Sequence, residues 1–132
     1  DTLSRNPNGF FLMIEGSNID KAAHSNNLEE MMEELLDFDR TAGAVLDWAS
    51  KHPGTLVVIT ADHNTGAFAL TGGSREQGEI TGRFGSGSHD GVAVPVYAFG
   101  AGSGDFTGIY ENTDIFNKIM NALKKGADKP VR

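Results

Sequence analysis

Six residues in this chain are candidate ligands for divalent metal ions, and they fall into four groups along the sequence. Carboxylates and imidazoles are hard or borderline metal ligands. In chain order they are Glu15, Asp20 with His24, Asp62 with His63, and His89. Asp20 and His24 are four residues apart, so on a helix they share one face and can bind a single ion.

Two of these groups follow apolar runs that are typical of buried strands. Residues 10–14 are five consecutive apolar residues that end at Glu15, and residues 55–60 end just before Asp62. In open α/β sheets, ligands bind outside the carboxyl ends of the strands. The sequence therefore predicts that both groups reach the same edge of one sheet.

Between these two runs the sequence predicts a long helix. Asn27 is an N-cap with Glu30 three residues later, which is a capping-box arrangement. Apolar residues recur at three- and four-residue spacing as far as Ala49, and Pro53-Gly54 end the helix. The order strand, helix, strand predicts a β-α-β unit with parallel strands and a right-handed crossover.

The segment 66–91 differs from the rest because it contains eight of the 17 glycines. We expect a mostly irregular, flexible segment with a short hairpin around residues 68–71. A strand over residues 94–99 follows, and a last helix begins after Thr113 as N-cap and ends near Leu123.

The direction of the strand at 94–99 follows from where the ligands lie. His89 precedes this strand by five residues, whereas Glu15 and Asp62 come after theirs. If all three meet at one edge, this strand begins where the other two end. We therefore expect it to be antiparallel to them; a long segment folding back across the sheet is the alternative.

Composition limits the function classes. With 132 residues the chain is one domain at most. Its net charge of −7 argues against nucleic acids and anionic membranes as partners. The absence of cysteine excludes structural disulfides and thiolate zinc sites. No apolar run approaches the roughly 18 residues of a membrane span.

Three motifs, in this order, resemble the C-terminal part of an alkaline phosphatase. They read I-E-G-S-N-I-D-K-A-A-H, V-V-I-T-A-D-H-N-T-G and S-H-D-G-V-A-V-P-V-Y-A-F-G. The resemblance extends from about Asn8 to Leu123. The tetrad T-A-D-H alone is less specific, because sulfatases and metal-dependent phosphoglycerate mutases of the same superfamily contain similar tetrads.

The resemblance implies an α/β fold, namely part of a three-layer α/β/α sandwich with a mostly parallel sheet. Residues 1–132 would form a single C-terminal portion of such a domain. Within it, residues 66–91 would be the flexible glycine-rich segment and residues 124–132 a frayed basic tail.

The resemblance also implies two zinc ions and one magnesium ion. By this resemblance the first zinc site is complete in the chain, and its ligands are Asp20, His24 and His89. The second zinc site is partial, with Asp62 and His63 as ligands.

Two further roles come from the resemblance. Glu15 would help to hold the magnesium ion. Lys21 matches a position that in some members assists phosphate through water, and a solvated lysine is its alternative interpretation. The family usually has Thr-Gly near the last histidine, whereas here Ser88 precedes His89 and Asp90 follows it.

The activity that the resemblance implies is hydrolysis of phosphate monoesters, in a periplasmic or extracellular enzyme. The family's N-terminal half supplies the serine nucleophile, a bridging aspartate, a threonine and a phosphate-binding arginine. None has a counterpart here, and no serine lies in an Asp-Ser-Ala context. We therefore expect a fragment that is inactive without its N-terminal half. Its unpaired sheet edges predict self-association into a homo-oligomer.

Two other interpretations stay open. The chain could belong to a sulfatase or a phosphoglycerate mutase, and upstream sequence would then distinguish a Cys-x-Pro-x-Arg motif from Asp-Ser-Ala. It could instead be a non-catalytic metal-binding or oligomerising module. That interpretation predicts a native gene that starts with a methionine near Asp1.

Overall fold

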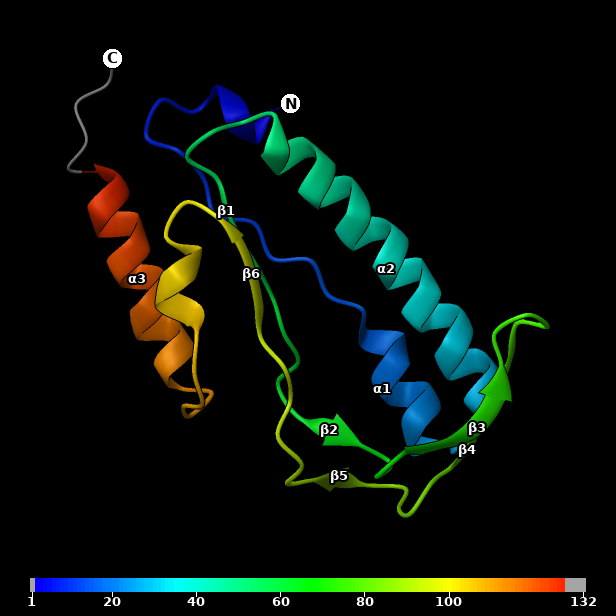
Figure 1. The fold of residues 1–132 in the computed structure, drawn as a ribbon. Coiled ribbons are helices and arrows are strands. Elements are labelled where there is room, and N and C mark those ends of the chain that lie inside the picture. The colour runs from blue at the N-terminus through cyan, green and yellow to red at the C-terminus, as the bar shows by residue number, and fades with distance from the viewer. Residues whose placement is uncertain (1, 128–132) are drawn as a thin grey trace.

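The computed structural model describes residues 2–127 and is an α/β structure (Figure 1). Its described part contains three α-helices, two short 3-10 helices and three two-stranded sheets. The helices are α1 (Ser17–His24), α2 (Leu28–Ser50) and α3 (Asp114–Ala127), with η1 (Leu3–Arg5) and η2 (Ser103–Phe106) as the 3-10 helices. None of the helices in residues 2–127 is long and apolar enough to cross a membrane.

Asn27 is the N-cap of helix α2, as predicted, but the capping box is only half formed, because Glu30 bonds to the Asn27 side chain while the Asn27 backbone N–H donates to the Ala22 carbonyl. The Glu30 backbone N–H donates to Asn27 Oδ1 at 3.2 Å, and Asn27 Nδ2 donates to Glu30 Oε2 at 3.0 Å. At the other end, His52 Nδ1 donates to the Trp48 carbonyl at 2.7 Å, and the two rings stack with their centroids 3.8 Å apart. His52 therefore satisfies a C-terminal carbonyl of the helix, as expected of a residue at this place.

The strand at the C-terminal side of the sequence is antiparallel to its partner, as predicted. Strand β1 (Leu56–Ile59) pairs with β6 (Tyr97–Gly100), with Leu56 opposite Gly100 and Ile59 opposite Tyr97. The expectation of a mostly parallel sheet is not met in the described residues, where all three strand pairs are antiparallel. The predicted single sheet is also replaced by three separate pairs.

The glycine-rich segment is more regular than predicted. It contains a hairpin of β3 (Ala69–Ser74) with β4 (Glu79–Arg83). It also contains β5 (His89–Asp90), which pairs with β2 (Asn64–Thr65) just before the segment. Gly73 has a φ of +143°, and a Cβ atom there would collide with the Glu79 carbonyl. Glycine at this position therefore permits close strand approach, which the sequence pattern alone does not distinguish from flexibility.

Residues 10–14 correct the sequence prediction, because they form no strand. Their side chains are exposed, with Met13 at 76% and Phe11 at 64%. A strand requires a ladder partner for its N–H and C=O groups, and β1 takes β6 as its partner. The parallel β-α-β unit is therefore not formed, and Figure 1 shows this segment as coil leading into α1.

A small core lies beneath α1 and positions the predicted ligands. Ala22 and Ala23 of α1 and Met31 of α2 are buried together, and Phe68 and Phe84 pack against them. Small alanines allow α1 to approach α2 closely. The opposite face of α1 is left free to present its polar side chains.

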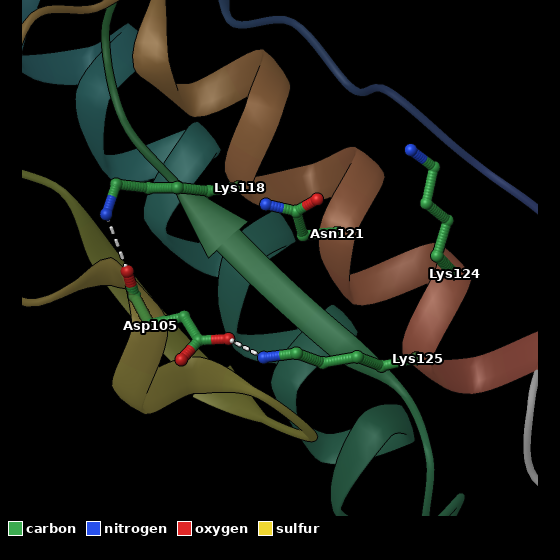
Figure 2. A pocket seen from close by; sticks show the side chains of 5 residues that line it. All are labelled: Asp105, Lys118, Asn121, Lys124 and Lys125. Atoms are coloured by element: carbon green, nitrogen blue, oxygen red, sulfur yellow. Dashed lines mark hydrogen bonds and ion pairs between the residues drawn. The ribbon is translucent and has the colours of Figure 1, made fainter.

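Helix α3 begins at Asp114, as predicted, but extends beyond Leu123 to Ala127. The rest of the predicted tail, residues 128–132, lies outside the described residues. Two lysines attach this helix to η2 (Figure 2): Lys118 Nζ donates to the Asp105 carbonyl and Lys125 Nζ to Asp105 Oδ2, both at 2.7 Å. The Lys125 hydrogen bond and charge lower the pKa of Asp105 below its ordinary value.

Candidate metal centre

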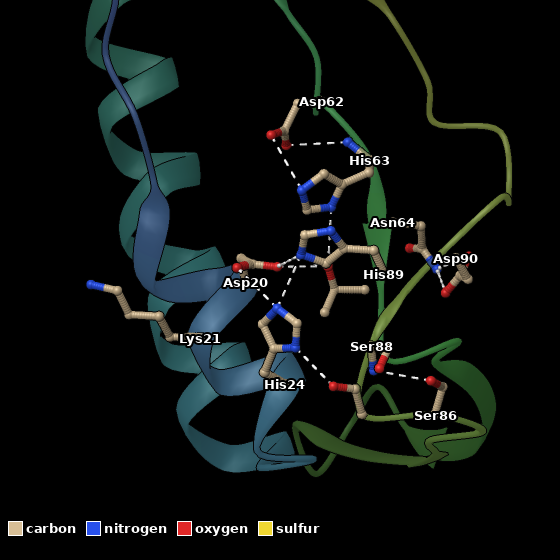
Figure 3. Close-up of polar contacts among 12 residues, drawn as sticks. Asp20, Lys21, His24, Asp62, His63, Asn64, Ser86, Ser88, His89 and Asp90 are labelled. Carbon is tan, nitrogen blue, oxygen red and sulfur yellow. Dashed lines mark hydrogen bonds and ion pairs between the residues drawn. The ribbon is translucent and has the colours of Figure 1, made fainter.

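Helix α1 presents Asp20 and His24 on its free face, as their spacing predicted (Figure 3). His24 Nε2 lies 3.5 Å from Asp20 Oδ2. His24 Nδ1 donates to the Gly87 carbonyl at 2.8 Å. In a neutral imidazole this leaves the lone pair on Nε2, the atom that points into the cluster.

His89, from strand β5, completes a three-ligand group with this pair. Its Nε2 atom lies 3.0 Å from His24 Nε2 and 3.6 Å from Asp20 Oδ1. A tetrahedral zinc ion with bonds of about 2.0–2.1 Å places its ligand atoms about 3.3–3.5 Å apart. The donor types and the spacing of these three residues therefore fit one zinc ion, with a fourth position open.

The second pair, Asp62 and His63, lies against the same cluster. His63 Nε2 is 3.3 Å from Asp62 Oδ2, and the His63 ring stacks on His89 with centroids 3.6 Å apart. Asp20, His63 and His89 also offer ligand atoms within 4.8 Å of one another. The structure thus contains two overlapping ligand groups that share Asp20 and His89, and it brings together five of the six predicted metal ligands.

Thr65 joins the two groups, and sequence reasoning missed it. Its side chain is almost fully buried; the hydroxyl donates to Asp20 Oδ1 at 2.6 Å and accepts from His63 Nδ1 at 3.2 Å. His63 therefore presents Nε2 to an ion, because Nδ1 holds the proton. Strand alternation is the available signal, since residues 63 and 65 point to the same side.

The Thr65 hydroxyl is also the main cause of a perturbed carboxylate. Its hydrogen bond is the largest influence and holds the pKa of Asp20 below the ordinary value. Burial opposes this shift, and the charges of His24, His89 and His63 lower the pKa further. The ionised carboxylate is the form that binds a metal ion.

Asn64 and Asp90 occupy the other side of the β2–β5 pair and were also missed. Asn64 Nδ2 donates to both oxygens of Asp90, at 3.1 and 2.9 Å. The Val92 backbone N–H and the Asn64 amide lower the pKa of Asp90 below its ordinary value. In the sequence, Asp90 stands out only as a departure from the family pattern.

Glu15 and Lys21 are not brought to the histidines. Glu15 lines a separate hollow of about 230 Å³ with Glu34 and Asp37 from α2. Lys21 Nζ donates to Asn18 Oδ1 at 3.1 Å and points away from the cluster in Figure 3. The larger hollow of about 460 Å³, between η2 and α3, is lined mainly by lysines and is also separate from these ligands. The predicted roles of Glu15 and Lys21 stay predictions.

Comparison with known proteins decides the family. A family model described as "Alkaline phosphatase" matches residues 1–83, which is more than half of the chain. The chain belongs to the alkaline phosphatase family. The predicted family is thereby confirmed over the first two motifs, since the third motif begins at Ser88, beyond the matched residues. The match supports neither the sulfatase nor the phosphoglycerate mutase alternative.

Curated alkaline phosphatases and a related phosphatase are similar to nearly the whole chain. The alkaline phosphatase of Escherichia coli (strain K12) is 31% identical, over 93% of this chain and 30% of that protein. Streptomycin-6-phosphate phosphatase of Streptomyces griseus is 36% identical, over 87% of this chain and 29% of that protein. The chain spans less than half the length of the curated relatives it matches.

Solved alkaline phosphatases share the fold. The enzyme from the Antarctic bacterium TAB5 is 41% identical with a TM-score of 0.84, over 92% of this chain and 37% of that one. A mutant of the TAB5 enzyme with Mg bound in the M3 site is 40% identical, also with a TM-score of 0.84. The described chain is therefore an α/β part of the alkaline phosphatase fold.

Proposed function

We propose that this chain forms the metal-binding part of a phosphatase that hydrolyses phosphate monoesters with two zinc ions and one magnesium ion. One observation supports this most directly. In a member of the alkaline phosphatase family, the ligand atoms of Asp20, His24 and His89 lie 3.0–3.6 Å apart, as one zinc ion requires.

Each predicted ligand has a place in this proposal. Asp20, His24 and His89 hold the first zinc ion. Asp62 and His63 hold the second, together with a ligand from another part of the protein, and the open surroundings of Asp62, whose side chain is 86% exposed, leave room for it. When bound, such ions polarise phosphate oxygens and lower the pKa of a bound water to about 7.

The residues of this chain orient the centre. Thr65 fixes the Asp20 carboxylate and the His63 tautomer, and the Gly87 carbonyl fixes the His24 ring. Orientation by such hydrogen bonds keeps ligand atoms aimed at one point before an ion arrives. Divalent ions would also reverse the local field of a chain with net charge −7, so that an anionic phosphate can approach.

The proposal extends to roles that lie beyond the His cluster. Glu15 contributes to the magnesium site, and Lys21 assists phosphate through water once its side chain turns from Asn18. The serine nucleophile and the phosphate-binding arginine come from the N-terminal half that the family supplies. The enzyme is periplasmic or extracellular, and its substrate is a phosphate monoester.

Zinc titration tests the metal centre. We expect calorimetry to find one tight zinc site in the chain, which is lost in His24→Ala and in His89→Ala. His52→Ala is the matched control, because His52 lies at the end of α2 and contacts Trp48. Tight binding that survives in both His24→Ala and His89→Ala would contradict the assignment.

A p-nitrophenyl phosphate assay tests the reaction. We expect no turnover by the zinc-loaded chain alone, because no serine lies in an Asp-Ser-Ala context, and turnover once the upstream reading frame is included. Turnover by the isolated chain at the rate of a complete enzyme would contradict the proposal that the serine nucleophile comes from the N-terminal half. An upstream reading frame without Asp-Ser-Ala would contradict the phosphatase activity itself.

A further inference from the structure

We propose that Asp90, through Asn64, is a positioning residue that sets the separation of the His63 and His89 rings and thereby the zinc affinity of the centre. The inference rests on the proposed metal-binding function. It adds two residues that bind no metal themselves. The observations that support it are the contacts of one carboxylate.

The Asp90 carboxylate accepts hydrogen bonds along both of its oxygens. Oδ1 accepts from Asn64 Nδ2 at 3.1 Å and from the Val92 backbone N–H at 3.0 Å. Oδ2 accepts from Asn64 Nδ2 at 2.9 Å and from the Ala67 backbone N–H at 2.9 Å. The side chain of Asp90, in β5, is therefore bonded to Asn64 in β2 and to Ala67 just after it.

The register places this contact beside both histidines. Asn64 is opposite Asp90 and Thr65 is opposite His89. Asn64 directly follows His63, and Asp90 directly follows His89. Because β2 and β5 are only two residues long, their backbone ladder is short, and the side-chain contact between Asn64 and Asp90 adds a second constraint on the register.

Asp90 also holds the turn that leaves β2. Ala67 has a φ of +45°, which is uncommon for a residue with a Cβ atom, and its N–H is the one that donates to Asp90. The preceding Gly66 N–H donates to the Ser88 carbonyl at 3.0 Å. These two contacts bind the chain that leaves β2 to the β5 segment, three and four residues after His63, whose ring stacks on His89.

A carboxylate is required because all of these contacts are N–H donors. In Asp90→Asn one oxygen becomes an NH₂ group, which faces donors instead of accepting from them. That change breaks the hydrogen bonds accepted by at least one of the two oxygens and preserves the size of the side chain. Asn64→Ala removes only the bonds from the Asn64 amide and leaves those from the Ala67 and Val92 backbone N–H groups in place.

The experiment compares zinc affinity in folded variants by calorimetry. We expect Asp90→Asn and Asn64→Ala each to lower zinc affinity roughly 10-fold, with unchanged stoichiometry, as for other residues that orient metal ligands. The exchanged pair Asn64→Asp with Asp90→Asn restores one donor–acceptor contact and should recover part of the loss. Asp105→Asn, a carboxylate paired with Lys125 away from the cluster, is the control and should leave affinity unchanged.

A second readout does not depend on zinc. The ¹³C and ¹⁵N shifts of the His63 and His89 rings in the metal-free protein report their stacking and tautomers. We expect them to move in Asn64→Ala and to stay in place in Asp105→Asn. Wild-type zinc affinity in folded Asp90→Asn, or unchanged ring shifts in Asn64→Ala, would overturn the inference. Absence of zinc binding by the wild type would instead count against the proposed function, while the ring shifts still decide the inference.

Discussion

Two regions of this chain have the same sequence pattern but different structures. In each, an apolar run precedes predicted metal ligands: residues 10–14 before Glu15, and β1 before Asp62 and His63. The second run forms a strand and its ligands converge on the histidine cluster. The first is exposed coil, and Glu15 lies in a different hollow.

The difference lies in the partners that each region finds. Strand β1 pairs with β6, and the residues after it are joined to distant segments by side chains, as Thr65 is to Asp20 and Asn64 to Asp90. In the part of the chain that the structure describes, residues 10–14 pair with no strand. An apolar run therefore forms a strand only where another strand pairs with it.

The exposed run also has an energetic consequence. Phe11, Leu12 and Met13 are 56–76% exposed, and burial of apolar surface is worth about 25 cal/mol per Å². The chain spans less than half the length of its curated relatives, which have further residues outside the matched part. In the isolated chain, the same surface favours self-association.

We expect the largest effect on zinc affinity from the loss of His89, which lies in the histidine cluster that the residues after β1 join. His89→Ala should lower zinc affinity by at least about 100-fold, because His89 belongs to both overlapping ligand groups. Competition with a chelator measures this. The comparison of His24→Ala with His63→Ala then identifies the third ligand, and a greater loss in His63→Ala would move the ion to the Asp20–His63–His89 group.

Thr65 is expected to have the next effect. Thr65→Val keeps the shape but removes the hydroxyl between Asp20 and His63, so zinc affinity should fall about 10-fold. Thr65→Ser retains the hydroxyl and should bind zinc nearly as tightly as the wild type. The ¹⁵N shifts of His63 report its tautomer, and an unchanged tautomer in Thr65→Val would show that another contact sets it.

Substitutions in residues 10–14 should change the self-association of the chain and leave its metal binding unchanged. We expect the chain to self-associate in a concentration-dependent way, and Met13→Lys to raise the dissociation constant several-fold by placing a charge in the apolar run. Light scattering after size exclusion measures it. Ile109→Lys is the matched control, since Ile109 is fully exposed elsewhere; an equal effect there would mean that the run has no special role.

The smallest effect concerns pH and the Asp105–Lys125 pair. The pKa of Asp105 in the folded chain lies below 3.8, so the pair contributes stability above that pH and loses it as pH falls through the lowered pKa. We expect Asp105→Asn to lower the melting temperature slightly at neutral pH, with little difference from the wild type well below pH 3.8. Lys124→Ala, which removes a neighbouring lysine instead, should not reproduce this pattern in thermal circular dichroism.

The sequence by itself determined the features that depend on local rules. The start of α2 follows from Asn27 and Glu30, whose bonds span three residues. The pairing of Asp20 with His24 follows from helix periodicity, and the direction of β6 follows from where His89 must lie. Each of these needed only contacts that are close in sequence, or one geometric condition on the ligands.

Only the tertiary structure decided which distant residues share a hydrogen bond. Thr65 reaches Asp20 across 45 residues, Asn64 reaches Asp90 across 26, and residues 10–14 find no strand partner among the described residues. Such contacts depend on the path of the whole chain. The sequence does not distinguish a polar side chain that finds a distant hydrogen-bond partner from one that does not, nor an apolar run that pairs with another strand from one that stays unpaired.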